Sequence, residues 1–230
     1  MLYGMFFGSK LKNIIMKIAI IAFLLATITL TGFSQDMENY MSVMIKQKKS
    51  MKMARTITEF QTLADNFEQI SQAESDKWHP LYYAAYCYIN MSFINKTNDD
   101  RIKYLNKAQS FIDKAIEIYP DESELFVLQG FIYEARIQTD PVNKGKEYSE
   151  NATKALEQAI EFNPENPRAY YLLGLNILHT PKQYGGGKEA ACPYLSKANN
   201  KFKTDIPENV LSPTWGGEEN NRQYVKNCIE

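Results

Sequence analysis

The sequence is poor in four residue types that mark common classes of protein. Its 230 residues include three cysteines, two histidines, 11 glycines and nine prolines. Three cysteines are too few for a scaffold held together by disulfides, and two histidines leave little scope for a histidine-rich metal site. Few glycines and prolines favour helices over many short strands, because short strands need frequent turns. A formal net charge of −1 excludes a strongly basic protein that binds nucleic acid by releasing counterions.

The common catalytic motifs are missing as well. The chain has no Gly-x-Ser-x-Gly and no His-Glu-x-x-His segment, and neither His79 nor His179 has a histidine or cysteine beside it at ligand spacing. The segment 185–188, Gly-Gly-Gly-Lys, differs from a phosphate-binding loop, because Lys182 replaces the first glycine of the motif and Glu189 replaces its serine or threonine. We therefore predict a protein that is not an enzyme and that holds no cofactor and no metal.

Residues 1–34 have the composition of an export signal. Three lysines precede residues 18–30, thirteen residues without a charge, and no acid occurs before Asp36. Gly32 and Ser34 place small residues at positions −3 and −1 of a cleavage site before Gln35. The segment Phe-Ser-Gln at this cleavage site resembles the signal peptides of secreted Bacteroidetes proteins. The sequence therefore predicts an exported protein, periplasmic or secreted, without the cysteine that a lipoprotein anchor needs.

Two alternatives remain for this segment. Residues 14–33 reach the length of about 20 residues that a spanning helix needs only by including Lys17, so an uncleaved anchor is the lesser interpretation. Met16 is also a natural start for a signal peptide, in which case residues 1–15 lie upstream of the true start. Cleavage after Ser34 removes three lysines and no acid, which moves the formal net charge from −1 to −4. The mature chain is then mildly acidic, without a stable membrane span and without affinity for nucleic acid.

The remaining sequence repeats with a period of 44 residues. Residues 108–120 and 152–164 share alanine, a large aliphatic residue four positions later, alanine three positions after that, and proline after another five. Residues 191–198 hold a partial third copy without the proline. Upstream of each copy lies a second pattern, at residues 81–88, 126–133 and 170–177, with alanine or glycine at its centre. Spacings of three and four residues predict helices with one apolar stripe, and the small residues predict close approach where two helices cross.

These paired patterns resemble the tetratricopeptide repeat (TPR) family over residues 78–200. The resemblance implies an all-α superhelix of TPR-like helical repeats with atypical capping helices. We expect a divergent helical pair over residues 36–75, repeats over 76–205, and a turn with a capping helix over 206–230. The period exceeds the family's usual 34 residues, and the extra residues fall in 95–100 and 139–145, as longer loops or as an extra helical turn.

In TPR proteins the first helix of each pair lines the concave face. Carried over by register, the groove positions here are aromatic and aliphatic: Tyr82, Tyr86, Ile89, Val127, Phe131, Glu134, Tyr171, Leu175 and Leu178. His79, Glu124 and Arg168 stand at the start of this groove. Either the row is an exposed groove for a peptide, a partner helix or an apolar ligand, or the N-terminal pair or the 218–229 helix covers it as core.

The function predicted from these features is binding. We expect an exported, non-enzymatic TPR-type scaffold that contacts a protein or peptide partner in the periplasm or cell envelope. The alternative is a periplasmic solute-binding accessory protein that holds a small apolar ligand in an aromatic pocket. The segment Tyr184-Gly-Gly-Gly, followed by an alanine-rich helix and Trp215-Gly, is similar to segments of some periplasmic repeat proteins, including TRAP-transporter-associated ones.

The three cysteines fit an exported protein in two ways. Cys192 and Cys228 could form a disulfide that ties the last repeat to the C-terminal helix, or all three cysteines could stay as buried thiols. Cys87 lies within a repeat helix, where it is expected to pack as a small apolar residue.

Overall fold

The computed structural model describes residues 37–95 and 97–229. The predicted signal peptide and its alternatives lie outside the described residues. Residues 37–43 are helical and belong to a first unit, and a second unit begins at Met44. Within the described ranges, no helix combines the length and the hydrophobicity needed to cross a bilayer.

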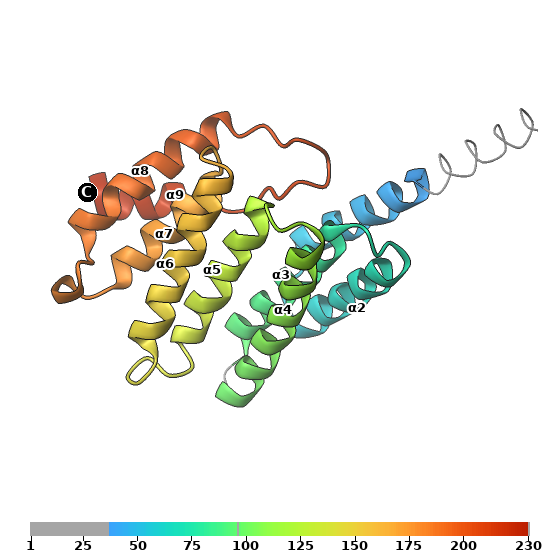
Figure 1. The fold of residues 1–230 in the computed structure, drawn as a ribbon, viewed down its shortest axis with the longest axis horizontal. Coiled ribbons are helices and arrows are strands. Elements are labelled where there is room, and N and C mark those ends of the chain that lie inside the picture. Colours follow the sequence, from blue (N-terminus) through green and yellow to red (C-terminus); the bar gives the residue numbers. More distant parts are fainter. Residues whose placement is uncertain (1–36, 96, 230) are drawn as a thin grey trace, which may run out of the picture. The chain divides into compact units, whose positions relative to one another are not determined.

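The second unit is helical from its start, and its described residues include no strand. This confirms the predicted all-α class (Figure 1). Residues 44–53, which we call the N-terminal helix, come first. The later elements are α2 (Ile57–Ala73), α3 (Trp78–Ile94), α4 (Asn98–Ile118), α5 (Ser123–Ile137), α6 (Gly145–Phe162), α7 (Pro167–His179), the 3₁₀ turn η1 (Lys182–Tyr184), α8 (Lys188–Thr204), α9 (Gly217–Tyr224) and the π-helical turn η2 (Val225–Ile229).

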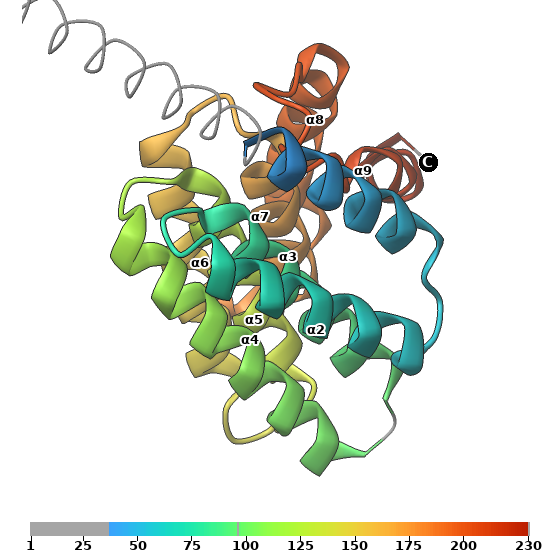
Figure 2. The same ribbon diagram turned by 90° about the vertical axis from the view of Figure 1, so that its right-hand side faces the viewer.

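The helices pack as the repeat predicts. Helix α3 packs against α4, α5 against α6, and α7 against α8, while α3, α5 and α7 also contact one another in turn. The alanines and central aliphatic residues of the three repeat copies are all 0% exposed: Ala108, Ile112, Ala115, Ala152, Leu156, Ala159, Ala191, Leu195 and Ala198. Helix α2 packs on α3 ahead of these pairs (Figure 2). The 44-residue period is therefore the period of the buried helix contacts.

Two glycines lie where paired helices cross. A Cβ atom built on Gly130 would lie 2.6 Å from Cγ of Leu156, and one on Gly174 would lie 2.7 Å from Cδ2 of Leu195. Carbon atoms in favourable contact stay about 3.5 Å or more apart. Glycine at these two positions therefore lets α5 approach α6, and α7 approach α8, without a clash.

The two polar insertions of the repeat take different forms. After α3, the hydroxyl of Thr97 accepts a hydrogen bond from the N–H of Asp100, so α4 begins at Asn98 and extends over 21 residues. After α5, the chain turns through residues 138–144, where the Asp140 carboxylate accepts a hydrogen bond from the N–H of Asn143. The first insertion is thus extra helix and the second is a turn.

Residues 205–216 join α8 to α9 in extended and bent conformations, and we call them the strap. Figure 1 shows this orange-red segment leaving α8, reaching toward α3 and returning to α9. The hydroxyl of Tyr83 on α3 donates a 2.6 Å hydrogen bond to the carbonyl of Leu211. The ammonium of Lys48 on the N-terminal helix donates to the carbonyls of Val210, at 2.8 Å, and Ser212. The middle of the strap is therefore held through its main-chain carbonyls at residues 210–212.

Candidate functional site

The predicted concave row is largely closed to solvent. Tyr82, Ile89 and Val127 are fully buried, and Tyr171 is 8% exposed. The other positions are partly buried: Tyr86, Phe131, Glu134, Leu175 and Leu178. Trp215 of the strap lies against Tyr86 and Phe131, and α9 contacts α7, so the C-terminal segment supplies the cover. Burial holds the pKa of Glu134 well above its ordinary value.

A pocket of about 880 Å³ lies beside this row, between the N-terminal helix, α3 and the strap. Five aromatic side chains line it: Phe60, Tyr83, Tyr86, Phe202 and Trp215. Three basic side chains line it from the N-terminal side: Lys48, Lys52 and Arg55. We call this space the aromatic pocket. Its volume falls in the range of about 300–1,000 Å³ in which proteins hold small molecules and cofactors.

The ring of Trp215 is the part of the pocket wall that the strap supplies. It lies 5.5 Å from the Tyr86 ring and 5.7 Å from the Phe131 ring, centroid to centroid, and is stacked on the latter. Its indole N–H donates a 2.8 Å hydrogen bond to the hydroxyl of Tyr82. Gly216 follows with a φ of 97°, a left-handed conformation that favours glycine and turns the chain into α9. The indole is thus held at both its face and its edge.

A buried polar network continues from Tyr82. The Tyr82 hydroxyl donates to Oε2 of Glu124 at 3.2 Å, and Oε1 of Glu124 accepts from Nε of Arg168 at 2.7 Å and from Nδ2 of Asn166 at 2.8 Å. Nη1 of Arg168 then donates to the Asp205 carboxylate at 3.0 Å. Burial would lower the pKa of Arg168, but the charges of Glu124 and Asp205 raise it above its ordinary value. The network links α3, α5 and α7 to the first residue of the strap.

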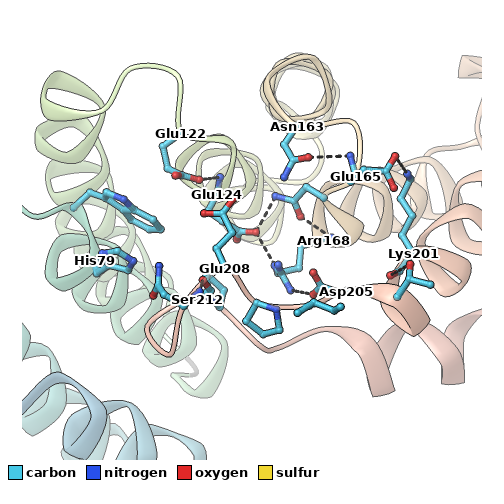
Figure 3. Close-up of a pocket in the computed structure, with 17 residues that line it drawn as sticks. His79, Glu122, Glu124, Asn163, Glu165, Arg168, Lys201, Asp205, Glu208 and Ser212 are labelled. Atoms are coloured by element: carbon cyan, nitrogen blue, oxygen red, sulfur yellow. Dashed lines mark hydrogen bonds and ion pairs between the residues drawn. The ribbon is translucent and has the colours of Figure 1, made fainter. Parts of the chain in front are cut away.

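Glu124, Asn166, Arg168 and Asp205 of this network line a second, polar pocket of about 430 Å³ (Figure 3). His79 lines it, stacked on Trp78 with the ring centroids 4.0 Å apart. Burial first, and the nearby Lys48 and Lys77 second, lower the pKa of His79 to about 4, so the ring is neutral at pH 7. Burial also raises the pKa of Glu122. No group of His, Cys, Asp and Glu in the described ranges is arranged to hold a metal ion.

The glycine-rich segment near residue 185 lies at a third pocket, of about 700 Å³, at the far ends of α5, α6 and α7. His179 and Tyr184 line it with Gly185 and Gly186. A Cβ atom on Gly186 would lie 2.0 Å from the carbonyl oxygen of Thr180, so glycine is needed for this turn to close. The segment therefore joins α7 to α8, as expected of a turn between paired helices.

Two of the three cysteines lie in the C-terminal part of the chain. Cys192 on α8 and Cys228 in η2 are joined in a disulfide, with their Cα atoms 5.6 Å apart. Cys87 is a buried free thiol in α3, and burial raises its pKa far above the ordinary value. The disulfide holds the last turns of the chain on the final repeat.

Sequence reasoning missed three parts of the aromatic pocket and its surroundings. It placed Glu124 and Arg168 at the start of the groove but not in contact, although the two positions differ by one repeat period. It used Trp215 only as part of a similarity to periplasmic repeat proteins, and not as the wall of a pocket. It also treated residues 36–75 only as an amphipathic pair, so the basic residues of the N-terminal helix went unnoticed. The sequence did contain a signal for these basic residues, because Lys48, Lys52 and Arg55 recur at helical spacing.

Three comparisons place the chain among known proteins. Its residues 58–176, just over half of the chain, match the family model described as Regulator of microtubule dynamics protein 1-3. Among solved structures, the HusA haemophore from Porphyromonas gingivalis is 30% identical with a TM-score of 0.76, over 83% of this chain and 93% of that one. TTC0263, a thermophilic TPR protein from Thermus thermophilus, is 15% identical with a TM-score of 0.57, over 83% and 92%. No curated protein matches the chain.

The TPR resemblance is therefore confirmed for the fold, through TTC0263, whereas the family model that matches is a different one. The match to HusA also fits the resemblance to Bacteroidetes proteins noted at the N-terminus. Neither structural relative is described as an enzyme. The chain belongs to the family described as regulator of microtubule dynamics protein 1-3, and the HusA haemophore is a relative of it.

Proposed function

We propose that the chain is a non-enzymatic binding protein that holds one planar, apolar ligand of the tetrapyrrole class in the aromatic pocket. The observation that carries the proposal is the wall of the pocket, where Trp215 lies against Tyr86 and Phe131 and is anchored through its N–H to Tyr82. Aromatic faces stack on flat conjugated rings, and a pre-positioned wall avoids the loss of entropy that a mobile side chain would suffer on binding.

The relative described as a haemophore supports the ligand class. In haem proteins the iron is held by histidine, cysteine, methionine or tyrosine. Of these types, Met51, Tyr83 and Tyr86 line the aromatic pocket, while both histidines lie at other pockets. Contact with the macrocycle, rather than an iron–imidazole bond, should therefore supply most of the affinity, and metal-free protoporphyrin is a suitable first probe.

This proposal selects the second of the two functions that the sequence left open. A scaffold that binds a peptide along the concave row needs Tyr82, Val127 and Tyr171 accessible, and these side chains are buried. A small ligand needs only the space beside Trp215. Residues 1–34 would act as the export signal of such a carrier, which fits a protein that meets its ligand outside the cytoplasm.

Absorbance titration with protoporphyrin and with haem tests the proposal in three proteins. We expect saturable binding of one ligand per chain to the wild type, and affinity weaker by about tenfold or more in Trp215→Leu, since a lost stacking face costs about 1–3 kcal/mol. Tyr184→Leu is the matched control, because Tyr184 is an exposed aromatic residue at the third pocket. Absence of binding by the wild type, or equal affinity of all three proteins, would overturn the proposal.

A further inference from the structure

Three basic side chains form one side of the aromatic pocket. Lys48, Lys52 and Arg55 follow one another at spacings of four and three residues, which brings them to one face of the N-terminal helix and its end. All three side chains line the pocket. None of them forms an ion pair with any carboxylate among the described residues. Glu59 interacts with Arg55 through its charge, and three acids line the pocket at the strap and α9, so the positive charge is concentrated on the N-terminal side of the pocket.

Lys48 is the unusual member, because it is 8% exposed. Its ammonium donates to main-chain carbonyls of the strap, those of Val210 and Ser212. The charges that act on it are those of Lys52 and Arg168, and both repel it. Burial, followed by this repulsion, lowers the pKa of Lys48 to about 8. A buried charge without a counter-charge is unfavourable. An anion bound beside it would supply that counter-charge.

The other two cations extend the site toward solvent. Lys52 and Arg55 are exposed, and the guanidinium of Arg55 donates to the main-chain carbonyls of Lys52 and Ala54 at 3.0 and 2.6 Å. Both of these hydrogen bonds use Nη1, so the opposite edge of the guanidinium can receive an anion. An arginine can donate two parallel hydrogen bonds to one carboxylate.

Two of the three acids at the pocket are paired with other cations. Asp205 is occupied by Arg168 at 3.0 Å, and Glu219 forms an ion pair with Arg222 at 3.4 Å. Glu218 lies one residue into α9 and is exposed. The pocket thus has an aromatic wall at the strap, acids at the strap and α9 of which Asp205 and Glu219 are paired, and cations without ion pairs to described residues on the N-terminal helix and just after its end.

We propose that Lys48, Lys52 and Arg55 form an anion subsite of the aromatic pocket, which binds the carboxylate groups of the planar ligand. This inference rests on the proposed function and goes beyond it, because it fixes the orientation of the ligand and its selectivity. The apolar rings lie against Trp215 and Tyr86, and the carboxylate edge faces the N-terminal helix. A ligand of the same shape without free carboxylates binds more weakly.

Protoporphyrin IX and its dimethyl ester are the probes, since they share the macrocycle and differ in charge. Titrations at low salt, in the same fraction of organic co-solvent, should give the wild type about a tenfold or greater preference for the free acid, which decreases as salt screens the exposed cations. In Lys52→Gln/Arg55→Gln this preference should fall toward one, with the affinity for the ester unchanged. Lys103→Gln, an exposed lysine of α4, is the control and should keep the preference.

Lys48→Met should remove the part of the preference that salt does not screen. If that variant fails to fold, the double variant of the two exposed residues still decides the question. Equal affinity of the wild type for acid and ester would overturn the anion subsite and leave the proposed function intact. Binding of neither probe would overturn both. A double variant that keeps the wild-type preference would also contradict the inference.

Discussion

The stability of the buried network around Glu124 offers a sharp test of the structure. Replacing Glu124 with glutamine keeps the shape of the side chain and removes its charge. The carboxylate accepts hydrogen bonds from Arg168, Asn166 and Tyr82, and the side chains of Glu124 and Arg168 are 9% and 6% exposed. In Glu124→Gln, Arg168 keeps only the partly exposed Asp205 as a counter-charge among the described residues.

The magnitude follows from burial. Removing one partner of a buried ion pair lowers the unfolding free energy by about 3–5 kcal/mol. Because Arg168 keeps its contact with Asp205, we expect a loss near the lower end, about 3 kcal/mol. Glu165 provides the matched control in the same polar pocket, since it pairs with Lys201 at 2.6 Å but is itself 79% exposed (Figure 3). An exposed pair is worth about 0–1 kcal/mol, so Glu165→Gln should have a small effect.

Equilibrium unfolding in urea, followed by circular dichroism of the helices, measures both variants against the wild type. We expect a large loss of unfolding free energy for Glu124→Gln and a loss within error, or nearly so, for Glu165→Gln. Similar losses for the two variants would refute the reasoning, because they would mean that the charge of Glu124 is not desolvated in the folded protein.

Three further predictions concern the fold. Gly130→Ala should destabilise the protein by about 1–3 kcal/mol in urea unfolding, because its Cβ overpacks the crossing of α5 and α6, whereas Gly145→Ala, whose Cβ would lie 3.9 Å from Cγ2 of Ile137, should not. Cys192→Ser/Cys228→Ser should lower stability by up to about 4 kcal/mol, and unchanged stability would show that the bridge does not form. The pKa of His79 is lowered from 6.5 to about 4 in the folded protein, so the unfolded chain binds this proton at a higher pH. His79 should therefore lower the unfolding free energy as the pH drops from 6.5 to 4, and His79→Gln should remove its share of that slope.

The repeat could be predicted from sequence because its signal is local and recurrent. Spacings of three and four residues around Ala108, Ala152 and Ala191 identify one buried stripe per helix, and the glycines at 130 and 174 identify the crossings. These features depend only on helical geometry, so a single sequence contains them.

The pocket could not be predicted in the same way, because it depends on contacts between distant segments. Trp215 meets Tyr82 across 133 positions of sequence, and Lys48 meets Ser212 across 164. The strap carries no periodic pattern, and its middle is held through main-chain carbonyls at residues 210–212, which any residue would supply. Its path over the concave row is therefore set by tertiary contacts.

The central claim is that a tetrapyrrole lies against Trp215, and tryptophan emission tests it most directly. The chain has two tryptophans, so Trp78→Phe leaves Trp215 as the only source of tryptophan emission. Titration of this variant with protoporphyrin should quench its emission strongly and saturate at one ligand per chain. A ligand that binds without quenching Trp215, or emission that changes only in proportion to added absorbance, would contradict the account.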